Sequence, residues 1–424
     1  MNTIYDWKLV NYGSIDEDSI WSDEKPSLKM HSIHAYPAKF PAFLASAGIE
    51  YAKKEGVYIR RVADVFCGCG TTALEAKVQG YSFWGCDINP VATLIARVKG
   101  EDYRIDWLKK LFRMISERYS DNTTRKQCYY EANERLKYWF WEEQYNELYC
   151  LYNSIIETTT SGKYRDAFLC IFSSILKRTS KWLQKSIKPQ VDPYKQPRNV
   201  WDCFEKKFFE FCDAILEMKN LNIMTNNDIV IENKSLFNTN ESNIDLILTS
   251  PPYVTSYEYA DLHQLSILWL EYENDYRKLR EGSVGSSYDV GTNMCNERVN
   301  MTASSIVNAL RINKCTKSKI GSVVRYYRDI ENTVNRCWNM LNNKGMIVFV
   351  IGDSMFRGVK LENSRHLLES MIKIGFDDIK ISRRRISKGI CVPYRNESGR
   401  FTKKNSCKNE VYHEEFIVSG RKYE

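Results

Sequence analysis

The sequence lacks the segments that carry a chain into or across a membrane. Met1-Asn-Thr-Ile-Tyr-Asp6 is neither basic nor apolar, unlike a secretory signal, and no apolar run reaches membrane-spanning length. The 424 residues are 43% hydrophobic and 27% charged, a composition typical of soluble globular proteins. We therefore expect a cytoplasmic chain without membrane contact, built as one large core with an insertion or as two domains.

Cysteine pairs with metal-site spacing are also missing. The thirteen cysteines are odd in number, and the closest two, Cys67 and Cys69, stand too near each other for two ligands of a usual zinc site. His31 and His34 have no cysteine or carboxylate cluster beside them, so contact with a cofactor or a phosphate suits them better. We expect reduced, mostly buried thiols and no metal.

The sequence contains no repeat of fixed period and no nuclease motif. Its formal net charge of +8 is a moderate excess, which permits a polyanionic partner without requiring one. Composition therefore leaves the function open, and only local motifs can narrow it.

One buried strand ends in an unusual corner, at Asp245-Leu-Ile-Leu-Thr-Ser-Pro-Pro-Tyr253. Two prolines stiffen the chain there, so Ser250 and Pro251 can direct oxygens at an amino group while Tyr253 offers a stacking face. An ordinary turn that closes a core strand is the alternative. The corner suits a planar ring that bears an NH2 group.

A second corner follows an earlier strand, in Val62-Ala-Asp-Val-Phe-Cys-Gly-Cys-Gly-Thr-Thr-Ala-Leu-Glu-Ala76. Gly68 and Gly70 let a ligand approach the backbone ahead of a helix amino terminus. The next strand, Ser82 to Asp87, ends in an acid at the distance where a nucleotide-binding unit holds ribose hydroxyls. A third glycine is missing, and Thr71-Thr72 begins the helix, which favours a nucleoside over a pyrophosphate.

The whole pattern predicts an α/β fold with a doubly wound, mostly parallel sheet and a helical insertion. We assign residues 1–100 to the cofactor half, 101–225 to the insertion and 226–424 to the catalytic half. Asn233 and Ser235 end the strand within Asp228–Ser235, where they can contact a cofactor base. The predicted helices are Ala42–Lys54 with Pro41 near its first turn, Leu136–Ile156, Ala167–Ile175, Phe204–Met218, Tyr257–Leu270, Tyr326–Leu341 and a helix ending at Ile374. The predicted later strands are Met346–Ile351, which follows a turn at Asn342–Gly345, then Ile379–Arg384 and Glu415–Val418.

Three further regions are interpreted from their pattern. Residues 282–319 are polar and short of apolar periodicity, which predicts a long excursion. The last two strands have no helix signal between them, which favours an antiparallel hairpin at the sheet edge. Asp261 and His263 can act as an acid-base pair, although a capping or orienting role suits them equally.

Within the insertion, a proline-broken loop interleaves basic and aromatic residues. Such a loop can bind a nucleic-acid backbone, and the alternative is a solvated charged loop. Two regions could approach a major groove, the helical insertion with this basic loop and the 282–319 excursion, and we favour the insertion with its loop. The candidate DNA-binding residues are Lys177, Arg178, Lys181, Lys185, Lys188, Lys195 and Arg198.

Asp245 to Tyr253 resembles the catalytic motif of S-adenosylmethionine-dependent DNA amino-methyltransferases. Its Ser-Pro-Pro-Tyr form is typical of members that methylate cytosine at exocyclic N4. Asp64-Val-Phe-Cys-Gly-Cys-Gly-Thr-Thr72 resembles their cofactor loop, and His34-Ala-Tyr-Pro-Ala-Lys-Phe-Pro41 resembles the preceding segment that lies over the methionine moiety. The resemblance covers the two parts of the chain on either side of the insertion, Met30–Val98 and Asp228–Lys422. It implies a seven-stranded, Rossmann-like methyltransferase sheet with S-adenosylmethionine as cofactor.

The resemblance also implies roles for single residues. Phe66, Gly68 and Gly70 would line the methionine part of the cofactor, and Asp87 would bind the ribose hydroxyls. Asn233 stands where an acid often contacts the adenine. The implied cofactor residues are Tyr36, Lys39, Asp64, Phe66, Gly68, Gly70, Thr71, Thr72, Asp87, Asn233 and Ser235, and the implied catalytic residues are Ser250, Pro251, Pro252 and Tyr253.

The resulting hypothesis is a methyltransferase that flips a cytosine out of double-stranded DNA and methylates N4, within a restriction-modification system whose nuclease would be another chain. Adenine N6 methylation, an RNA substrate and a non-enzymatic nucleic-acid-binding module stay open as alternatives. A monomer and a dimer are equally compatible with the sequence, and no stretch encodes a readable recognition sequence.

Overall fold

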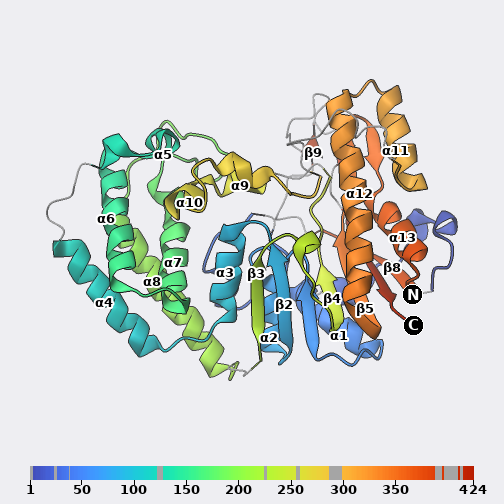
Figure 1. The fold of residues 1–424 in the computed structure, drawn as a ribbon, viewed down its shortest axis with the longest axis horizontal. Helices are drawn as coiled ribbons and strands as arrows, with labels where there is room; N and C mark the ends of the chain where they lie inside the picture. Colours follow the sequence, from blue (N-terminus) through green and yellow to red (C-terminus); the bar gives the residue numbers. More distant parts are fainter. Residues whose placement is uncertain are drawn as a thin grey trace.

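A computed structural model gives the architecture. It describes residues 3–424 except 23–25, 38, 122–127, 224–226, 255–257, 286–297, 387–393, 396–408 and 411–413. Figure 1 shows a sheet covered by helices, with a lobe of further helices beside one of its edges.

The core of the fold is a seven-stranded sheet with the order β3-β2-β1-β4-β5-β11-β8. The first five strands in that order are parallel, and β11 is antiparallel to both of its neighbours. The predicted doubly wound, mostly parallel sheet is therefore confirmed. The seven strands are β1 (Arg61–Asp64), β2 (Ser82–Asp87), β3 (Ile229–Asn233), β4 (Ile244–Thr249), β5 (Leu341–Ile351), β8 (Asp377–Arg385) and β11 (Glu414–Arg421).

Two layers of helices cover the sheet, because alternate residues of each strand point to opposite faces. Val62 and Leu246 pack toward α1 (Ala42–Lys54) and α2 (Thr71–Val78). Ala63 and Ile247 pack on the other face. The helices of that second layer are α11 (Met301–Ile312), α12 (Lys317–Met340) and α13 (Asn363–Ile374).

The helical insertion forms a separate lobe beside β3 (Figure 1). Its apolar core is continuous with α3 (Pro90–Gly100) and with α10 (Gln264–Trp269), so the lobe is joined to the sheet by shared packing. The insertion helices are α4 (Ile105–Asp121), α5 (Glu134–Trp139), α6 (Glu142–Thr158), α7 (Lys163–Thr179) and α8 (Val200–Asn220).

Two predicted helices are wrong in their continuity. The helix over Leu136–Ile156 is two helices, because Phe140 is extended and fully buried against the edge of Trp269. The stretch Tyr257–Leu270 is α9 (Tyr259–Leu262) and α10, separated at the buried His263, and Tyr257 itself lies outside the described residues. Burial of one aromatic side chain overrode the local helical pattern at each break.

The predicted antiparallel pairing of the last two strands at the sheet edge is confirmed, because β8 and β11 pair antiparallel there. β11 lies between β5 and β8, and β8 is the edge strand. Packing explains why β11 is the inner strand of this pair: Phe416 and Val418 of β11 enter the core under the α11–α13 layer, and an edge position would expose them.

The prediction of a polar excursion over residues 282–319 is wrong for the second half of that range, where α11 packs on the core through Ala303, Ile306 and Leu310. Residues 286–297 lie outside the described residues. A hairpin of β6 (Ser354–Phe356) and β7 (Val359–Leu361) precedes α13, where a helix was expected. A further short pair joins β9 (Tyr394–Arg395) to β10 (Asn409–Glu410).

Other boundaries differ by less. β5 begins at Leu341 and includes the predicted turn, where Lys344 has a positive φ of 65°. Pro41 caps α1 as predicted. None of the helices among the described residues is long and apolar enough to cross a membrane. The cysteines that the structure describes are all free, and most are buried.

Candidate active site

Strand ends bring the predicted site residues to one edge of the sheet. β1 to β5 are parallel, so the loops after them lie together at the carboxyl edge, and β1 and β4 are neighbours where the chain order reverses. Open α/β sheets bind ligands at such a reversal. The glycine loop after β1 and the proline corner after β4 therefore meet there.

Asp64 joins these two loops. Its Oδ1 accepts hydrogen bonds from Thr249 Oγ1 at 2.6 Å and from the Phe66 N–H at 3.1 Å, and its Oδ2 accepts one from Thr72 Oγ1 at 2.8 Å. Burial raises the pKa of this carboxyl to about 6, against the lowering effect of the three donors. Because donors of this chain occupy both oxygens, we place Asp64 as a positioning residue under the site.

The glycine loop has the backbone that its sequence requires. Gly68 and Gly70 have φ values of 46° and 74°, in the left-handed region that side chains disfavour. A Cβ on Gly70 would stand 2.7 Å from the Cβ of Ala96, so α2 and α3 approach as closely as they do only with glycine there. A Cβ on Gly68 would lie against the ring of Tyr36.

Asp87 ends β2 beside this loop. Its carboxylate accepts the Gly68 N–H at 3.0 Å and the Asn89 N–H at 2.8 Å, and Asn233 donates to its carbonyl at 2.9 Å. Burial raises the pKa of Asp87 to about 6. Each carboxylate oxygen has one backbone donor and keeps capacity for another, as a ribose-binding acid needs.

Two buried polar atoms near this loop have no hydrogen-bond partner among the described residues. They are Thr71 Oγ1, at the start of α2, and Asn89 Nδ2, at the cap of α3. Buried polar groups are ordinarily satisfied, so these atoms are suited to a ligand's polar groups. Together with Asp87 they fit a nucleoside with several hydroxyls and ring nitrogens.

The other predicted cofactor residues surround this loop less directly. Tyr36 stacks on His263, with ring centroids 4.9 Å apart, and Lys39 Nζ donates to the His31 carbonyl at 3.0 Å. Phe66 is partly buried against the α11–α13 layer. Ser235 caps a short helical turn, with its Oγ accepting the Phe237 N–H at 3.3 Å.

The proline corner is braced from the far side of the sheet. Tyr253 donates its hydroxyl to Glu415 of β11 at 2.8 Å, and Glu415 pairs with Arg384 at 2.8 Å. The ring lies over the backbone of Gly352, where a Cβ would come within 3.2 Å of it. Within the described part of the chain, the half-buried Ser250 makes no side-chain hydrogen bond. Its hydroxyl is thus available to a ligand.

His263 and Asp261 have orienting contacts. Burial lowers the pKa of His263 to about 3, so the ring is neutral near pH 7, and its Nε2 has no partner among the described residues. Asp261 pairs with Arg280 at 2.6 Å. His31 hydrogen-bonds to Glu75 at 2.8 Å, and no group of metal-ligating side chains is found where the structure is described.

The insertion contacts the segment that follows the corner. Gln264 of α10, fully buried, accepts hydrogen bonds from Arg135 Nε at 2.6 Å and Trp139 Nε1 at 2.9 Å. Ser173 of α7 hydrogen-bonds to Ser266 of α10 at 2.7 Å. Hydrogen bonds therefore join the lobe to the segment that follows the proline corner.

The predicted DNA-binding residues divide into two groups. Lys177 and Lys195 are half-buried and donate to backbone carbonyls of their own loop. Burial lowers the pKa of Lys195 to about 8. Lys185, Lys188 and Arg198 are exposed; Arg178 and Lys181 are intermediate, with Lys181 above the ring of Trp141.

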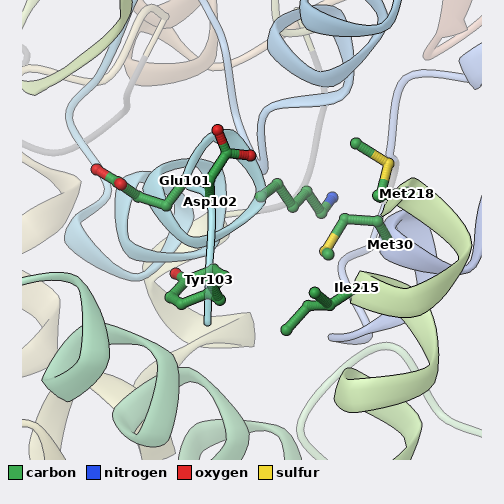
Figure 2. A pocket seen from close by; sticks show the side chains of 7 residues that line it. Met30, Glu101, Asp102, Tyr103, Ile215 and Met218 are labelled. Carbon is green, nitrogen blue, oxygen red and sulfur yellow. The ribbon is translucent and has the colours of Figure 1, made fainter. Parts of the chain in front are cut away.

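A small pocket lies away from this edge. Met30, Ile215 and Met218 line one side and Glu101 and Asp102 the other, with Tyr103 below (Figure 2). The pocket stands at the carboxyl end of α3, where Gly100 packs on Ile229 at the beginning of β3. It therefore belongs to the opposite edge of the sheet from the two strand-end loops.

Sequence reasoning missed three supports of the site. Asn89 carried a signal, since Asn followed by Pro90 is typical of a helix amino terminus. Thr249 and Glu415 carried none, because their partners are 185 and 162 residues away.

Comparison with known proteins finds similarity to DNA methylases. Residues 7–97, which contain the glycine loop and Asp87, match the N6_N4_Mtase family model, described as DNA methylase. The type II methyltransferase M.MvaI of Kocuria varians is 23% identical over 361 residues, 78% of each chain. The type II methyltransferase M.MjaII of Methanocaldococcus jannaschii is 35% identical over 91 residues, 21% of this chain and 16% of that protein.

These matches support a DNA amino-methyltransferase. Among solved structures, an rRNA methyltransferase, AviRa from Streptomyces viridochromogenes, covers 93% of this chain and 90% of its own at 8% identity and a TM-score of 0.33, too loose an overlap to support an argument. The methyl donor of the protein described here is S-adenosylmethionine. This cofactor fits the polar groups of Asp87, Thr71 and Asn89 around the glycine loop.

Proposed function

We propose that this DNA methyltransferase methylates the exocyclic N4 of cytosine in double-stranded DNA. The observation that carries the proposal is the side chain at the first position of the proline corner. Ser250 directly follows Thr249, which Asp64 holds against the glycine loop. A hydroxyl therefore stands beside the cofactor loop, at the place where the target amino group must be held.

Cytosine N4 is a weak nucleophile because its lone pair is conjugated with the ring. Ser250 Oγ and the Pro251 carbonyl accept the two N–H bonds and draw the nitrogen toward a tetrahedral form, so its lone pair becomes available. The bound cofactor supplies an electrophilic methyl group on a sulfonium. After transfer the methylated amino group carries a positive charge, and it becomes neutral by releasing one of its protons to water.

The remaining residues bind and orient. Asp87, Asn89 and Thr71 hold the cofactor's polar groups, with Asn233 and Ser235 beside its base, while Tyr36 and Phe66 exclude water near the methyl group. Tyr253, fixed by Glu415, stacks on the target base once it leaves the duplex. Pro252 keeps the corner rigid.

We infer a place for the enzyme in a type II restriction-modification system, which the names of both matching relatives support. The cognate nuclease is a separate chain, both act on DNA in the cytoplasm, and the helical insertion recognises the DNA sequence.

The test is nucleoside analysis of treated DNA. Unmodified, enzymatically amplified DNA is incubated with the protein and S-adenosylmethionine, digested to nucleosides and examined by mass spectrometry. We expect N4-methyldeoxycytidine. N6-methyldeoxyadenosine alone, or methylation confined to an RNA substrate, would replace cytosine as the target; binding of DNA with no methyl incorporation would leave only a binding module.

A further inference from the structure

A short hairpin projects from the insertion after α7. In this hairpin, residues 181–192, Asp192 N–H donates to the Lys181 carbonyl and Leu183 N–H to the Gln190 carbonyl, each at 2.8 Å. Trp182 and Val191 face each other as an antiparallel bridge between these bonds. The chain reverses at residues 184–189, which form the tip.

An aromatic anchor fixes the base of the hairpin. Trp182 is only 2% exposed and stacks on Trp139 of α5, with ring centroids 4.9 Å apart. The Lys181 N–H also donates to the Trp139 carbonyl at 2.8 Å. Trp139 in turn donates to Gln264 behind the catalytic corner. The hairpin thus stands on the same structure that positions α10.

Two lysines stiffen the hairpin further. Lys195 Nζ donates to the Lys177 and Trp182 carbonyls at 2.8 and 2.7 Å, and Lys177 Nζ donates to the Ser186 carbonyl at the tip at 2.8 Å. These two cations brace the hairpin. The cations at its tip are Lys185 and Lys188, both exposed.

The tip presents one apolar side chain between those cations. Ile187 is 44% exposed. A single exposed isoleucine is ordinary on a protein surface. This one differs because it stands on a braced turn, between two lysines, in a segment with seven basic residues and one acidic residue over positions 177–198. Charge of this kind complements a polyanion.

The hairpin extends beyond the carboxyl edge of the sheet. The carboxyl end of α3 lies beside the amino end of α7, through Arg97–Asp166 at 3.0 Å and Glu101–Lys163 at 3.6 Å, so the two helices run in opposite directions. Measured from these ion pairs toward the carboxyl edge of the sheet, α7 extends roughly 20 Å to its last residue, Thr179. In the same direction α3 extends only roughly 10 Å to its first residue, near Asp87. The end of α7, where the hairpin begins, therefore lies beyond that edge. Figure 1 shows α5, α9 and α10 at this same end.

We propose that the hairpin enters duplex DNA beside the target base and that Ile187 fills the space which the extruded base leaves in the stack. Lys185 and Lys188 contact the flanking phosphates. This inference rests on the proposed function, because only a reaction on a flipped base needs the duplex opened. An apolar side chain in the stack offsets part of the cost of unstacking, and an aliphatic wedge suits that space.

The experiment compares a paired with an unpaired target. Once the methylated position is known, two duplexes are made, one fully paired and one with a mismatch at the target base. Ile187→Ala should weaken binding and lower kcat/KM by about tenfold on the paired duplex, yet change both by less than about twofold on the mismatched one, since the mismatch already lowers the opening cost. An equal loss on both duplexes, or no loss on either, overturns the proposal.

Two further variants serve as references. Leu221→Ala removes a side chain that is 55% exposed after the far end of α8 and should match wild type on both duplexes. The double variant Lys185→Ala/Lys188→Ala should weaken both duplexes alike and reduce the salt dependence of binding, because it removes phosphate contacts only. Unchanged salt dependence would remove these lysines from the interface and refute the proposed docking.

Failure of the proposed function would be seen separately. If wild type transfers no methyl group to any DNA, that function fails. The hairpin is then judged by binding alone, on a mixed-sequence duplex with and without one mismatched cytosine, where the same contrast between Ile187→Ala and wild type upholds or refutes it.

Discussion

The glycine loop after β1 and the proline corner after β4 are neighbours that are held in different ways. Positive φ angles at Gly68 and Gly70 shape the first, within one strand-turn-helix unit. Distant side chains brace the second, through Thr249 to Asp64 and Tyr253 to Glu415. The loop, where we propose that the cofactor binds, is thus shaped locally, whereas the corner depends on the whole sheet. Changes in the loop should therefore alter cofactor affinity, and changes in the corner should alter the rate of transfer.

The strongest test of this division is Ser250→Ala. Losing one of the two acceptors of the target amino group should lower kcat by about 100- to 1,000-fold, the range for removing one preorganised group. The dissociation constant for S-adenosylmethionine should stay within about twofold, since the proposed cofactor contacts lie in the loop. Steady-state kinetics and calorimetry check both values. Ser242→Ala, an exposed serine before β4, is the control, and a cofactor affinity lost together with the rate would contradict the division.

The converse variant is Asp87→Asn. Loss of a charged acceptor for the ribose should raise the cofactor dissociation constant by about 10- to 100-fold, with a much smaller change in kcat at saturation. Because burial raises the pKa of Asp87 to about 6, wild-type affinity should fall as the pH drops below that value and the carboxylate becomes protonated.

Calorimetry between pH 5 and 8 measures this dependence, where each pH unit well below 6 should weaken binding by about tenfold. The variant should bind with little change over the range. An equally steep dependence in Asp87→Asn would assign the titration to another group.

A smaller effect is expected from Thr249→Val, which keeps the shape and removes a donor to buried Asp64. The free energy of unfolding should fall by about 1–3 kcal/mol, and kcat should drop while cofactor affinity changes little. Burial already raises the pKa of Asp64, so native Asp64 holds a proton between about pH 4 and 6 that the unfolded chain has lost, and stability falls as the pH rises through this window.

Thr249→Val raises that pKa further, so its stability deficit should be larger at pH 8 than at pH 5 in urea denaturation. Thr333→Val is the matched control, because the buried Thr333 hydroxyl bonds only to a carbonyl of its own helix, at 2.7 Å. Equal effects in the two variants would mean that the bond to Asp64 has no special role.

The smallest expected effect is that of Tyr253→Phe. It keeps the ring for stacking and removes the hydroxyl bond to Glu415, so unfolding should cost about 0.5–1.5 kcal/mol less and kcat should fall only a few-fold. Tyr253→Ala should instead lose most of the rate, since it removes the stacking face. A phenylalanine variant as inactive as the alanine variant would show that the hydroxyl, and not the ring, is what the reaction needs.

The difference between local and long-range support also explains which residues of the candidate site the sequence could predict. Gly68, Gly70 and Asp87 are readable because strand, turn, helix and next strand follow one another within a short segment. The partners of Asp64 and Tyr253 are not, since nothing near Thr249 or Glu415 encodes a bond across more than 160 residues.

The mispredicted elements have physical causes of the same kind. Phe140 and His263 interrupt helical patterns because their side chains are buried in contacts supplied by other parts of the fold. The sequence does contain an apolar pattern typical of a helix in α11, since Ala303, Ile306, Val307 and Leu310 have helical spacing. Polar residues between and around them made this pattern weak.

The central claim is that Ser250 and Pro251 hold a flipped cytosine opposite the cofactor loop. Base-resolved sequencing of modified positions in DNA from cells that express the protein tests it most directly, with cells expressing Ser250→Ala as the control. The account predicts N4-methylcytosine at one position of a single short sequence motif, and its loss in the variant. N6-methyladenine at that motif, or undiminished methylation by Ser250→Ala, would contradict it.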